Sequence, residues 1–474
     1  MIAGLDAAAL LAAYRAGELS PVEVMNDVLA HAATREGELH ALCAVDPDTA
    51  LAAARASEAR WRAGTALPLD GLPVTLKENI AVPGAAYRLG TAATPDDAVA
   101  DFEAPPAARL REAGAIAWTR TTMPDYGMLS SGLSSLYAEP ARNPWDVRMT
   151  PGGSSAGAAA AAAAGYGPLH LGTDIGGSIR LPAGWCGLVG LKPSHGRVPI
   201  KPGYAGRVAG PLTRTVADAA LMLAALARPD ARDPTQLPPG QVLPRPLDTK
   251  GLRIGLMLDA GWGDAVQPEV AAAITAAARA FEGAGAIVEP VAPFTTRDMA
   301  DGIDRFWRMR SWLDISALPQ QKRAKVLPYI LDWVAPAAGY DGATVFHGYS
   351  QMQALREAAN AACEPFDFVL SPVSPMPAWP AHQASPLHDP ARPFEHIAFT
   401  LPYNMSEQPA LAINAGYTSQ GLQPLPIGLQ IIGCRFDDAG VLAMGALWEQ
   451  LRPEQRAWPF KPWAGAPEGT GRPR

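Results

Sequence analysis

The chain has 474 residues, a length at which a single hydrophobic core usually divides, so we expect one large domain with insertions or two closely packed subdomains. Hydrophobic residues make up 48% of it and charged residues 18%, which suits a globular enzyme and excludes an extended disordered chain. A net charge of -7 argues against a general nucleic-acid-binding surface.

The N-terminus shows no targeting signal and the chain no membrane span. The sequence begins without a basic segment or a secretory apolar core, so we expect a cytoplasmic location. The Ala/Gly run around 156–167 has side chains too small to give a membrane span enough hydrophobicity. The four cysteines lie far apart in sequence, which excludes a C-x-x-C pair or a metal knuckle and predicts reduced, buried thiols at Cys43, Cys186, Cys363 and Cys434.

Residues 1–65 are predicted to form a helical wrap around the rest of the chain. Apolar residues recur at helical spacing over residues 5–63. Ser20, Pro21 and Glu23 supply the N-cap, first-turn proline and capping-box signals of its second helix. Because no chemical motif occurs in this segment, we expect its role to be structural.

Residues 66–474 are predicted to form an α/β domain, because strands and helices alternate along them. Strands are expected at 72–80, 115–119, 168–174, 251–259 and 286–291, and helices at 155–164, 215–227 and 268–285. The Pro-, Asp- and Arg-rich residues 228–250 predict a surface connection. The many aromatics of 300–350 either line a lid or acyl pocket or fill a helical core. The Pro-, Gly- and Arg-rich tail, 458–474, is expected to fray.

Two Gly-Gly-Ser turns, 152–154 and 176–178, carry the strongest chemical signal. Glycine supplies positive φ angles and lets another group approach closely, so each turn can present its serine hydroxyl. Successive N–H groups of Ile175, Gly176, Gly177 and Ser178 can form a nest around an anion. This pattern predicts an oxyanion hole with the nucleophile built into it.

The two turns allow two other interpretations. A phosphate-binding loop needs a lysine after its last glycine, and neither turn has one, nor does either carry a dinucleotide-binding G-x-G-x-x-G. Paired glycines also occur in ordinary loops without any function, and that alternative stays open.

A nucleophilic serine needs a base. None of the eight histidines lies in a recognisable triad motif, and His195, the nearest, is most simply a loop residue. Lys77 is a better candidate because it stands inside an apolar, strand-like run. Strand lysines usually point to solvent; if Lys77 points inward, burial lowers its pKa and the neutral amine can accept a proton from a serine.

These motifs together resemble the amidase signature family, the Ser-cisSer-Lys amidohydrolases. The resemblance is strong over residues 70–226. It rests on GLPVTLKENI (71–80), RNPWD (142–146), PGGSSAG (151–157), GTDIGGSIRLPA (172–183) and GLVGLKPSHGRVP (187–199). It implies a central mixed, twisted β-sheet covered by helices on both sides, with a variable substrate-pocket region at about 300–350.

The resemblance assigns a catalytic relay to Lys77, Ser154 and Ser178, with a cis peptide bond before Ser154. The backbone N–H groups of the oxyanion hole are those of Ile175, Gly176, Gly177 and Ser178. Five further residues are implied to bind substrate or support the site: Met128, Ser130, Ser131, Asp174 and Arg180. Of these, Ser131 is implied to form a hydrogen bond near the relay, and Asp174 and Arg180 are implied to hold the nucleophile turn.

The implied function is hydrolysis of carboxylic amide C–N bonds in small molecules through a Ser178 acyl-enzyme, with ester or carbamate cleavage as a side activity. No cofactor or metal is implied, nor a nucleic-acid or membrane partner, and a homodimer is allowed. One departure from the family pattern is Ala156, which replaces a glycine in the first serine turn.

An alternative function is that of an amidotransferase A-type subunit, which releases ammonia from glutamine for tRNA-linked transamidation. The segment MLSSGLSSLY (128–137) lacks the threonine, glutamate and asparagine common in that branch, and the net acidity does not favour a tRNA partner. A catalytically silent binding protein on the same scaffold is the third possibility.

Overall fold

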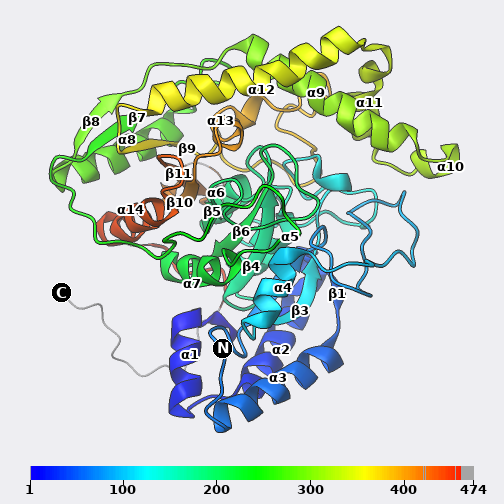
Figure 1. The fold of residues 1–474 in the computed structure, drawn as a ribbon, viewed down its shortest axis with the longest axis vertical. Coiled ribbons are helices and arrows are strands. Elements are labelled where there is room, and N and C mark those ends of the chain that lie inside the picture. The colour runs from blue at the N-terminus through cyan, green and yellow to red at the C-terminus, as the bar shows by residue number, and fades with distance from the viewer. Residues whose placement is uncertain (1, 420, 422, 454, 461–474) are drawn as a thin grey trace.

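A single mixed sheet of eleven strands runs through the described residues, 2–419, 421, 423–453 and 455–460, of this computed structural model (Figure 1). The tail predicted to fray lies outside these residues from position 461 onward. In spatial order the strands are β1-β3-β2-β4-β6-β5-β10-β11-β9-β7-β8. Their bounds are β1 Leu42–Val45, β2 Pro73–Lys77, β3 Ile116–Thr121, β4 Leu169–Asp174, β5 Val189–Lys192, β6 Val208–Thr213, β7 Arg253–Leu256, β8 Ile287–Pro290, β9 Phe368–Pro372, β10 Ala410–Tyr417 and β11 Pro426–Gly433.

Parallel and antiparallel pairs both occur, so the predicted mixed sheet is confirmed. β2 runs parallel to β3 and β4, and β7 runs parallel to β8 and β9. The strands between these two groups pair antiparallel. Every residue of the inner strands β2, β4, β5, β6, β9 and β11 is buried, which explains their apolar runs without polar alternation.

Helices cover both faces of the sheet, also as predicted. α5 and α6 pack on one face, while α4, α7, α8 and α14 pack on the other. The α-helices are α1 Ala7–Ala16, α2 Pro21–Leu39, α3 Pro47–Arg62, α4 Pro105–Glu112, α5 Ala156–Ala163, α6 Arg180–Cys186, α7 Val216–Leu226, α8 Pro268–Gly283, α9 Arg297–Ser316, α10 Gln320–Arg323, α11 Pro328–Val334, α12 Gly342–Cys363, α13 Leu401–Met405 and α14 Asp438–Leu451. Short 3-10 turns lie at Ile2–Gly4, Asp125–Gly127, Ala335–Gly339 and Glu395–Ile397.

The predicted helical wrap of residues 1–65 also contains one strand. β1 interrupts the helices and pairs antiparallel with β3 as an edge strand of the main sheet. The short run Leu42–Val45 closes the hydrogen-bonding edge that β3 would otherwise expose. Leu10, Val24 and Val28 also share one hydrophobic core with the sheet, so residues 1–65 are part of the main body of the fold.

The aromatic-rich region 300–350 is mainly helical and belongs to the helices α9 to α12. These helices form a layer at the end of the molecule away from α1, α2 and α3 (Figure 1). Residues 228–250 hold no helix or strand, in agreement with the predicted connection. No helix among the described residues is both long and apolar enough to cross a membrane.

The cysteines match their predicted state with one exception. All four are free thiols; Cys186 and Cys363 are buried, and Cys43 is partly buried. Cys434, however, is exposed, contrary to the prediction. It follows Gly433, the last residue of β11, where the chain leaves the sheet.

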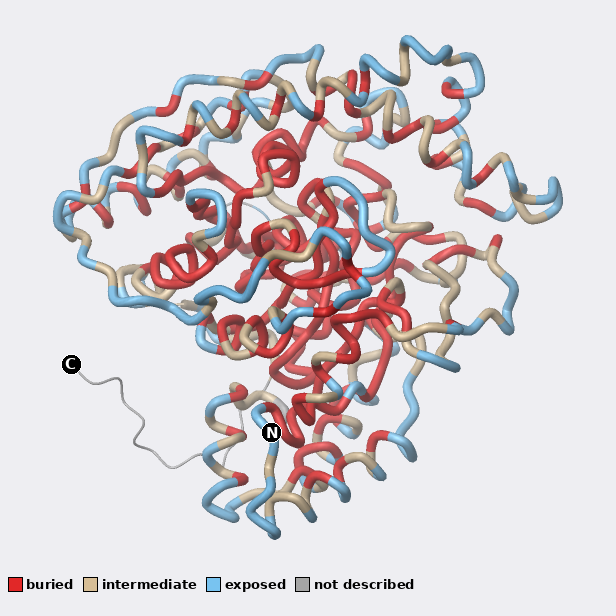
Figure 2. Tube along the Cα trace, in the orientation of Figure 1, coloured by how far each residue is buried: buried red, intermediate tan, exposed pale blue. Residues whose placement is uncertain are grey.

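Helix α5 packs closely on the sheet and against α6 because its side chains are small. It consists of alanine and Gly157, all buried, inside the most continuously buried part of the chain (Figure 2). A Cβ atom on Gly157 would come within 2.1 Å of the carbonyl oxygen of Ala41 and 2.5 Å of the amide nitrogen of Thr122. The start of the helix therefore touches backbone directly.

We predict that Gly157→Ala destabilises the protein by about 1–3 kcal/mol or more, because backbone atoms must shift to admit one methyl group. Gly37→Ala is the matched control, since it lies exposed in helix α2 with open space around it and should stabilise by about 1 kcal/mol through helix propensity. Urea unfolding of both variants measures the difference. Equal midpoints for the two variants would contradict this packing.

Candidate active site

The amine of Lys77 lies at the end of β2 among three hydroxyl groups. Its side chain is fully buried, so the inward orientation considered from the sequence is the one observed. Nζ lies 2.7 Å from the Ser154 hydroxyl, 3.1 Å from the Ser155 hydroxyl and 3.1 Å from the Thr173 hydroxyl. The structure thus brings two of the three predicted relay residues, Lys77 and Ser154, into direct contact.

The hydrogen bonds around this amine allow its lone pair to face Ser154. The Ser155 hydroxyl donates to the Thr173 carbonyl oxygen, so toward Lys77 it can act only as an acceptor. The Thr173 hydroxyl is in turn held by the side-chain amide of Asn79, which donates to it at 3.0 Å. A neutral amine has two N–H groups and one lone pair. If the N–H groups go to Ser155 and Thr173, the lone pair points at the Ser154 hydroxyl.

The electrostatics favour the neutral amine. Burial lowers the pKa of Lys77 well below its ordinary value, and the nearby guanidinium of Arg207 lowers it further. The carboxylate of Asp174 acts in the opposite direction but does not outweigh them. Among the described residues no carboxylate forms an ion pair with Lys77, which leaves the ammonium form uncompensated.

The first serine turn has the backbone that the resemblance implies. The peptide bond between Gly153 and Ser154 is cis. The next residue, Ser155, donates its N–H to the Ser178 carbonyl oxygen at 3.2 Å, which ties the two serine turns together. The backbone of Ser131 packs directly against Gly153, so that a Cβ at that glycine would lie 2.5 Å from the Ser131 carbonyl oxygen.

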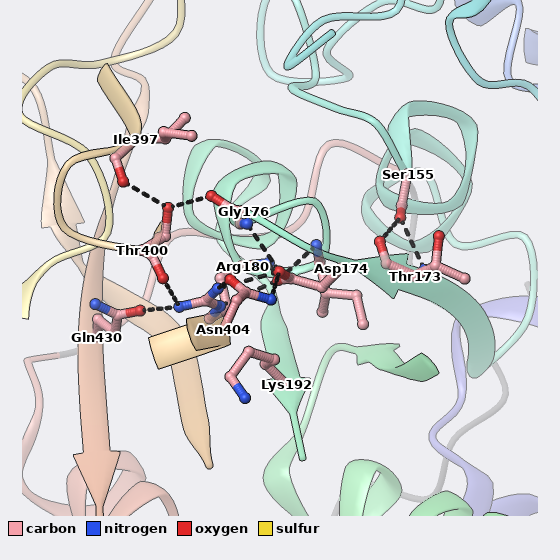
Figure 3. Close-up of polar contacts among 12 residues, drawn as sticks. Ser155, Thr173, Asp174, Gly176, Arg180, Lys192, Ile397, Thr400, Asn404 and Gln430 are labelled. Carbon is pink, nitrogen blue, oxygen red and sulfur yellow. Dashed lines mark hydrogen bonds and ion pairs between the residues drawn. The ribbon is translucent and has the colours of Figure 1, made fainter. Parts of the chain in front are cut away.

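The Asp174 carboxylate folds back into the second serine turn (Figure 3). It accepts the N–H of Gly177 at 2.8 Å and that of Ile179 at 3.1 Å. The prediction that Gly177 donates to the oxyanion hole is therefore wrong, because its N–H is already bound by Asp174. The N–H groups of Ile175, Gly176 and Ser178 have no acceptor within the described part of the chain, which leaves them for an oxyanion.

Arg180 holds Asp174 in this position, as predicted. The two side chains form an ion pair with no solvent exposure, with Nε and one oxygen 3.1 Å apart. Burial would raise the pKa of Asp174, but the Arg180 guanidinium and the Asn404 amide outweigh it and hold that pKa below its usual range. Asn404 donates to Asp174 at 2.8 Å, and Gln430 accepts from Arg180 at 2.7 Å (Figure 3).

Thr400 holds the same turn from the other side. Its hydroxyl donates to the Gly176 carbonyl oxygen at 2.6 Å, and its own carbonyl accepts from Arg180 at 2.9 Å (Figure 3). Gly177 has φ of 129°, and a Cβ there would lie 2.5 Å from the Thr400 hydroxyl. Only glycine fits this position, because both the conformation and the space exclude a side chain.

Ser178 is partly exposed and opens into a cavity. Met128 and Ser130 line this cavity, as predicted, but Ser131 does not, because it lies beneath the Gly153 peptide instead. Its hydroxyl accepts the N–H of Leu133, and among the described residues it forms no hydrogen bond with a relay residue. The lining residues are Tyr126, Gly127, Met128, Leu129, Ser130, Ile175, Gly176, Ser178, Tyr204, Trp307, Arg310, Ser311, Trp333, Phe394 and Ile397.

Aromatic rings form the wall opposite the nucleophile turn. Phe394 packs edge-on against Trp307, with ring centroids 5.4 Å apart, and against Trp333 at 5.5 Å. Both alternatives for the 300–350 aromatics hold in part, since Trp307 and Trp333 line the cavity while Tyr329 is buried in the helical layer without lining it. Phe346 on α12 fits neither, because it is exposed. Among the described residues no group of three or more His, Cys, Asp or Glu side chains is placed to hold a metal ion.

Several site residues could not be identified from the sequence. Ser155 and Thr173 lie inside the quoted motifs, and their position beside Ser154 and Asp174 was the available signal. Thr400, Asn404 and Arg310 come from distant segments without a motif, and only folding brings them to the site. His195 lies 3.9 Å from Glu407 and does not line the cavity, in agreement with a non-catalytic loop role.

Comparison with known proteins agrees with the fold and the motifs. The family model Amidase matches residues 23–442. The chain is 36% identical to the A-type subunit of the Glutamyl-tRNA(Gln) amidotransferase from Myxococcus xanthus, over 93% of this chain and 96% of that protein. It resembles the crystal structure of a bacterial aryl acylamidase of the amidase signature family with a TM-score of 0.87 and 28% identity, covering 95% of this chain and 97% of the other.

A third similar protein is the peptide amidase from Stenotrophomonas maltophilia, with a TM-score of 0.79, 26% identity and coverage of 94% of this chain and 96% of that one. These matches span nearly the whole chain, and the family model covers all of the quoted motifs. The chain therefore belongs to the amidase family, the amidase signature enzymes, as its motifs indicated.

Proposed function

We propose that this protein hydrolyses carboxylic amides of small molecules through an acyl-enzyme on Ser178. One observation carries the proposal: a buried amine lies 2.7 Å from the Ser154 hydroxyl, while Ser178 opens into a cavity with aromatic walls, next to backbone N–H groups without an acceptor in the described part of the chain. Proton acceptor, nucleophile and oxyanion donors are the three parts that acyl transfer requires.

The proposed mechanism follows from these positions. Neutral Lys77 takes the Ser154 proton, Ser154 takes the Ser178 proton, and the Ser178 oxygen attacks the amide carbonyl. The N–H groups of Ile175, Gly176 and Ser178 stabilise the oxyanion, each loss costing on the order of 3 kcal/mol in comparable sites. Ser154 then returns the proton to the leaving amine, and water releases the acyl group by the reverse steps.

The cavity favours amides with an aromatic or apolar part. Trp307, Trp333 and Phe394 offer ring faces and edges to a substrate, and such surfaces bind apolar groups by burial and ring stacking. The structural similarity to an aryl acylamidase supports the same substrate class. Ester and carbamate cleavage would use the same relay.

The second candidate is a glutamine-hydrolysing subunit of a tRNA-dependent amidotransferase. The 36% identity to such a subunit favours it, and it would require partner subunits. Glutamine carries an α-ammonium group as well as a carboxylate. Among the described residues no acidic side chain lines the cavity to receive that ammonium, and for this reason we place the small-molecule amidase first.

Lys77→Ala and Ser178→Ala should each reduce amide hydrolysis by on the order of 10⁴-fold or more, because proton acceptor and nucleophile act as one unit. Hydrolysis of an aryl anilide measures the rate, and a serine-reactive fluorophosphonate should label the wild type but not Ser178→Ala. Lys250→Ala and Ser350→Ala, both outside the site, are the matched controls. Near-full activity in either site variant would refute the assignment.

The pH dependence of kcat/KM should show a lysine active as its free base. Because burial lowers the pKa of Lys77, activity should fall as pH drops through that lowered pKa and stay level from there to above pH 9. A lysine with an ordinary pKa would instead give a rise continuing to about pH 10. Burial and Arg180 also lower the pKa of Lys192 to about 7, so Lys192→Met is the control. If Lys192→Met no longer showed the fall of kcat/KM at low pH, that fall would be assigned to Lys192 instead of Lys77.

Substrate preference separates the two candidate functions. The purified chain alone should hydrolyse aryl anilides with a kcat/KM at least about tenfold above that for glutamine, because the cavity has aromatic walls and no acid for the α-ammonium. Glutaminase activity that appears only with amidotransferase partner subunits, together with inert anilides, would support the second candidate instead.

A further inference from the structure

Two arginines face one tyrosine at the edge of the cavity. The guanidinium carbon of Arg310 lies 4.5 Å from the centre of the Tyr204 ring, and that of Arg207 lies 5.2 Å from it. Tyr204 and Arg310 line the cavity that also contains Ser178, whereas Arg207 is buried and donates to the Pro202 carbonyl oxygen. Positive charge therefore gathers at one side of a site that is otherwise apolar.

Neither guanidinium has an acidic partner. Most arginines of the fold form ion pairs, but within the described residues Arg207 and Arg310 form none. The Nε of Arg310 is buried without a hydrogen-bond acceptor. Asp314, one turn further along α9, is exposed and does not pair with Arg310. A guanidinium has five donors in a planar fork that matches a carboxylate, and neither of these two guanidinium groups has a carboxylate partner among the described residues.

We propose that Arg310, with Tyr204, binds an anionic group of the substrate, so that the enzyme prefers amides carrying a carboxylate. This inference rests on the proposed amidase function and names its substrate class more closely. The carboxylate would accept from the Arg310 guanidinium, which lines the cavity without an ion-pair partner in the described part of the chain, while the aromatic wall holds the apolar part of the substrate. Arg310 is then a specificity-determining residue that takes no part in proton transfer.

The electrostatic field at this point supports the proposal. Burial would raise the pKa of Tyr204, but Arg207 and Arg310 outweigh it and hold that pKa below its ordinary value. The surroundings thus stabilise negative charge at the phenol oxygen. A substrate carboxylate at the same place would be stabilised in the same way.

The test compares matched substrates on the full-length enzyme. One pair differs on the acyl side, the 4-nitroanilides of succinic acid and of butyric acid; the other differs on the amine side, 4-carboxyacetanilide and acetanilide. We expect wild type to prefer the anionic member of at least one pair by about 10- to 100-fold in kcat/KM, mainly through KM. Arg310→Met should remove this preference, measured as the ratio of kcat/KM for the anionic and neutral members of each pair.

Arg310→Lys should keep part of the preference, because charge remains and the planar fork is lost. Arg279→Met, an exposed arginine on α8, is the matched control and should keep all of it. In wild type, benzoate should inhibit neutral anilide hydrolysis competitively and far more strongly than benzyl alcohol, a measurement that does not depend on folding of a variant.

Equal or lower kcat/KM for the anionic member of both pairs, a preference that survives in Arg310→Met, or equal inhibition by benzoate and benzyl alcohol would overturn the inference. Hydrolysis of the neutral anilides in that case would leave the proposed amidase function standing. If no anilide of either kind were cleaved, the proposed function itself would fail.

Discussion

The structure depends on an amine that is buried without a counter-ion. Lys77 has three hydroxyl neighbours and no carboxylate partner among the described residues, so its charged form would be left without compensation. This environment lowers the pKa of the amine well below its ordinary value and so favours the neutral base. The surrounding elements position the groups around this amine. Strands β2 and β4 bring Lys77 and Thr173 together, and the cis turn before α5 places Ser154 and Ser155 beside the same nitrogen.

A second buried basic side chain, Arg180, has the opposite environment, because acceptors surround it. Arg180 forms an ion pair with the Asp174 carboxylate and donates hydrogen bonds to oxygen atoms of Thr400, Asn404 and Gln430 (Figure 3). That full set of partners keeps its charge and makes it the anchor of the nucleophile turn. At the end of β4, Thr173 thus contacts the amine of Lys77, and the next residue, Asp174, forms an ion pair with Arg180. The difference between the two cations lies in their neighbouring acceptors.

Much of this could be predicted from the sequence. Lys77, Ser154 and Ser178 lie in motifs with distinctive glycine spacing, and the alternation of strands and helices indicated the layered fold. Other features depend on three-dimensional packing. That Asp174 takes the Gly177 N–H is a matter of side-chain conformation, and β1 is too short a run to distinguish from a loop between helices. Arg310 and Thr400 reach the site from segments far along the chain, where no local pattern marks them.

The protonation state of Lys77 can be measured directly by nitrogen NMR. Protein labelled with ¹⁵N at lysine Nζ would be titrated from pH 5 to 10, and the signal of Lys77 identified by its loss in Lys77→Met. At pH 8 the signal of Lys77 should have the chemical shift of a neutral amine, with protonation only at lower pH. An ammonium signal for Lys77 persisting to pH 10 would contradict it.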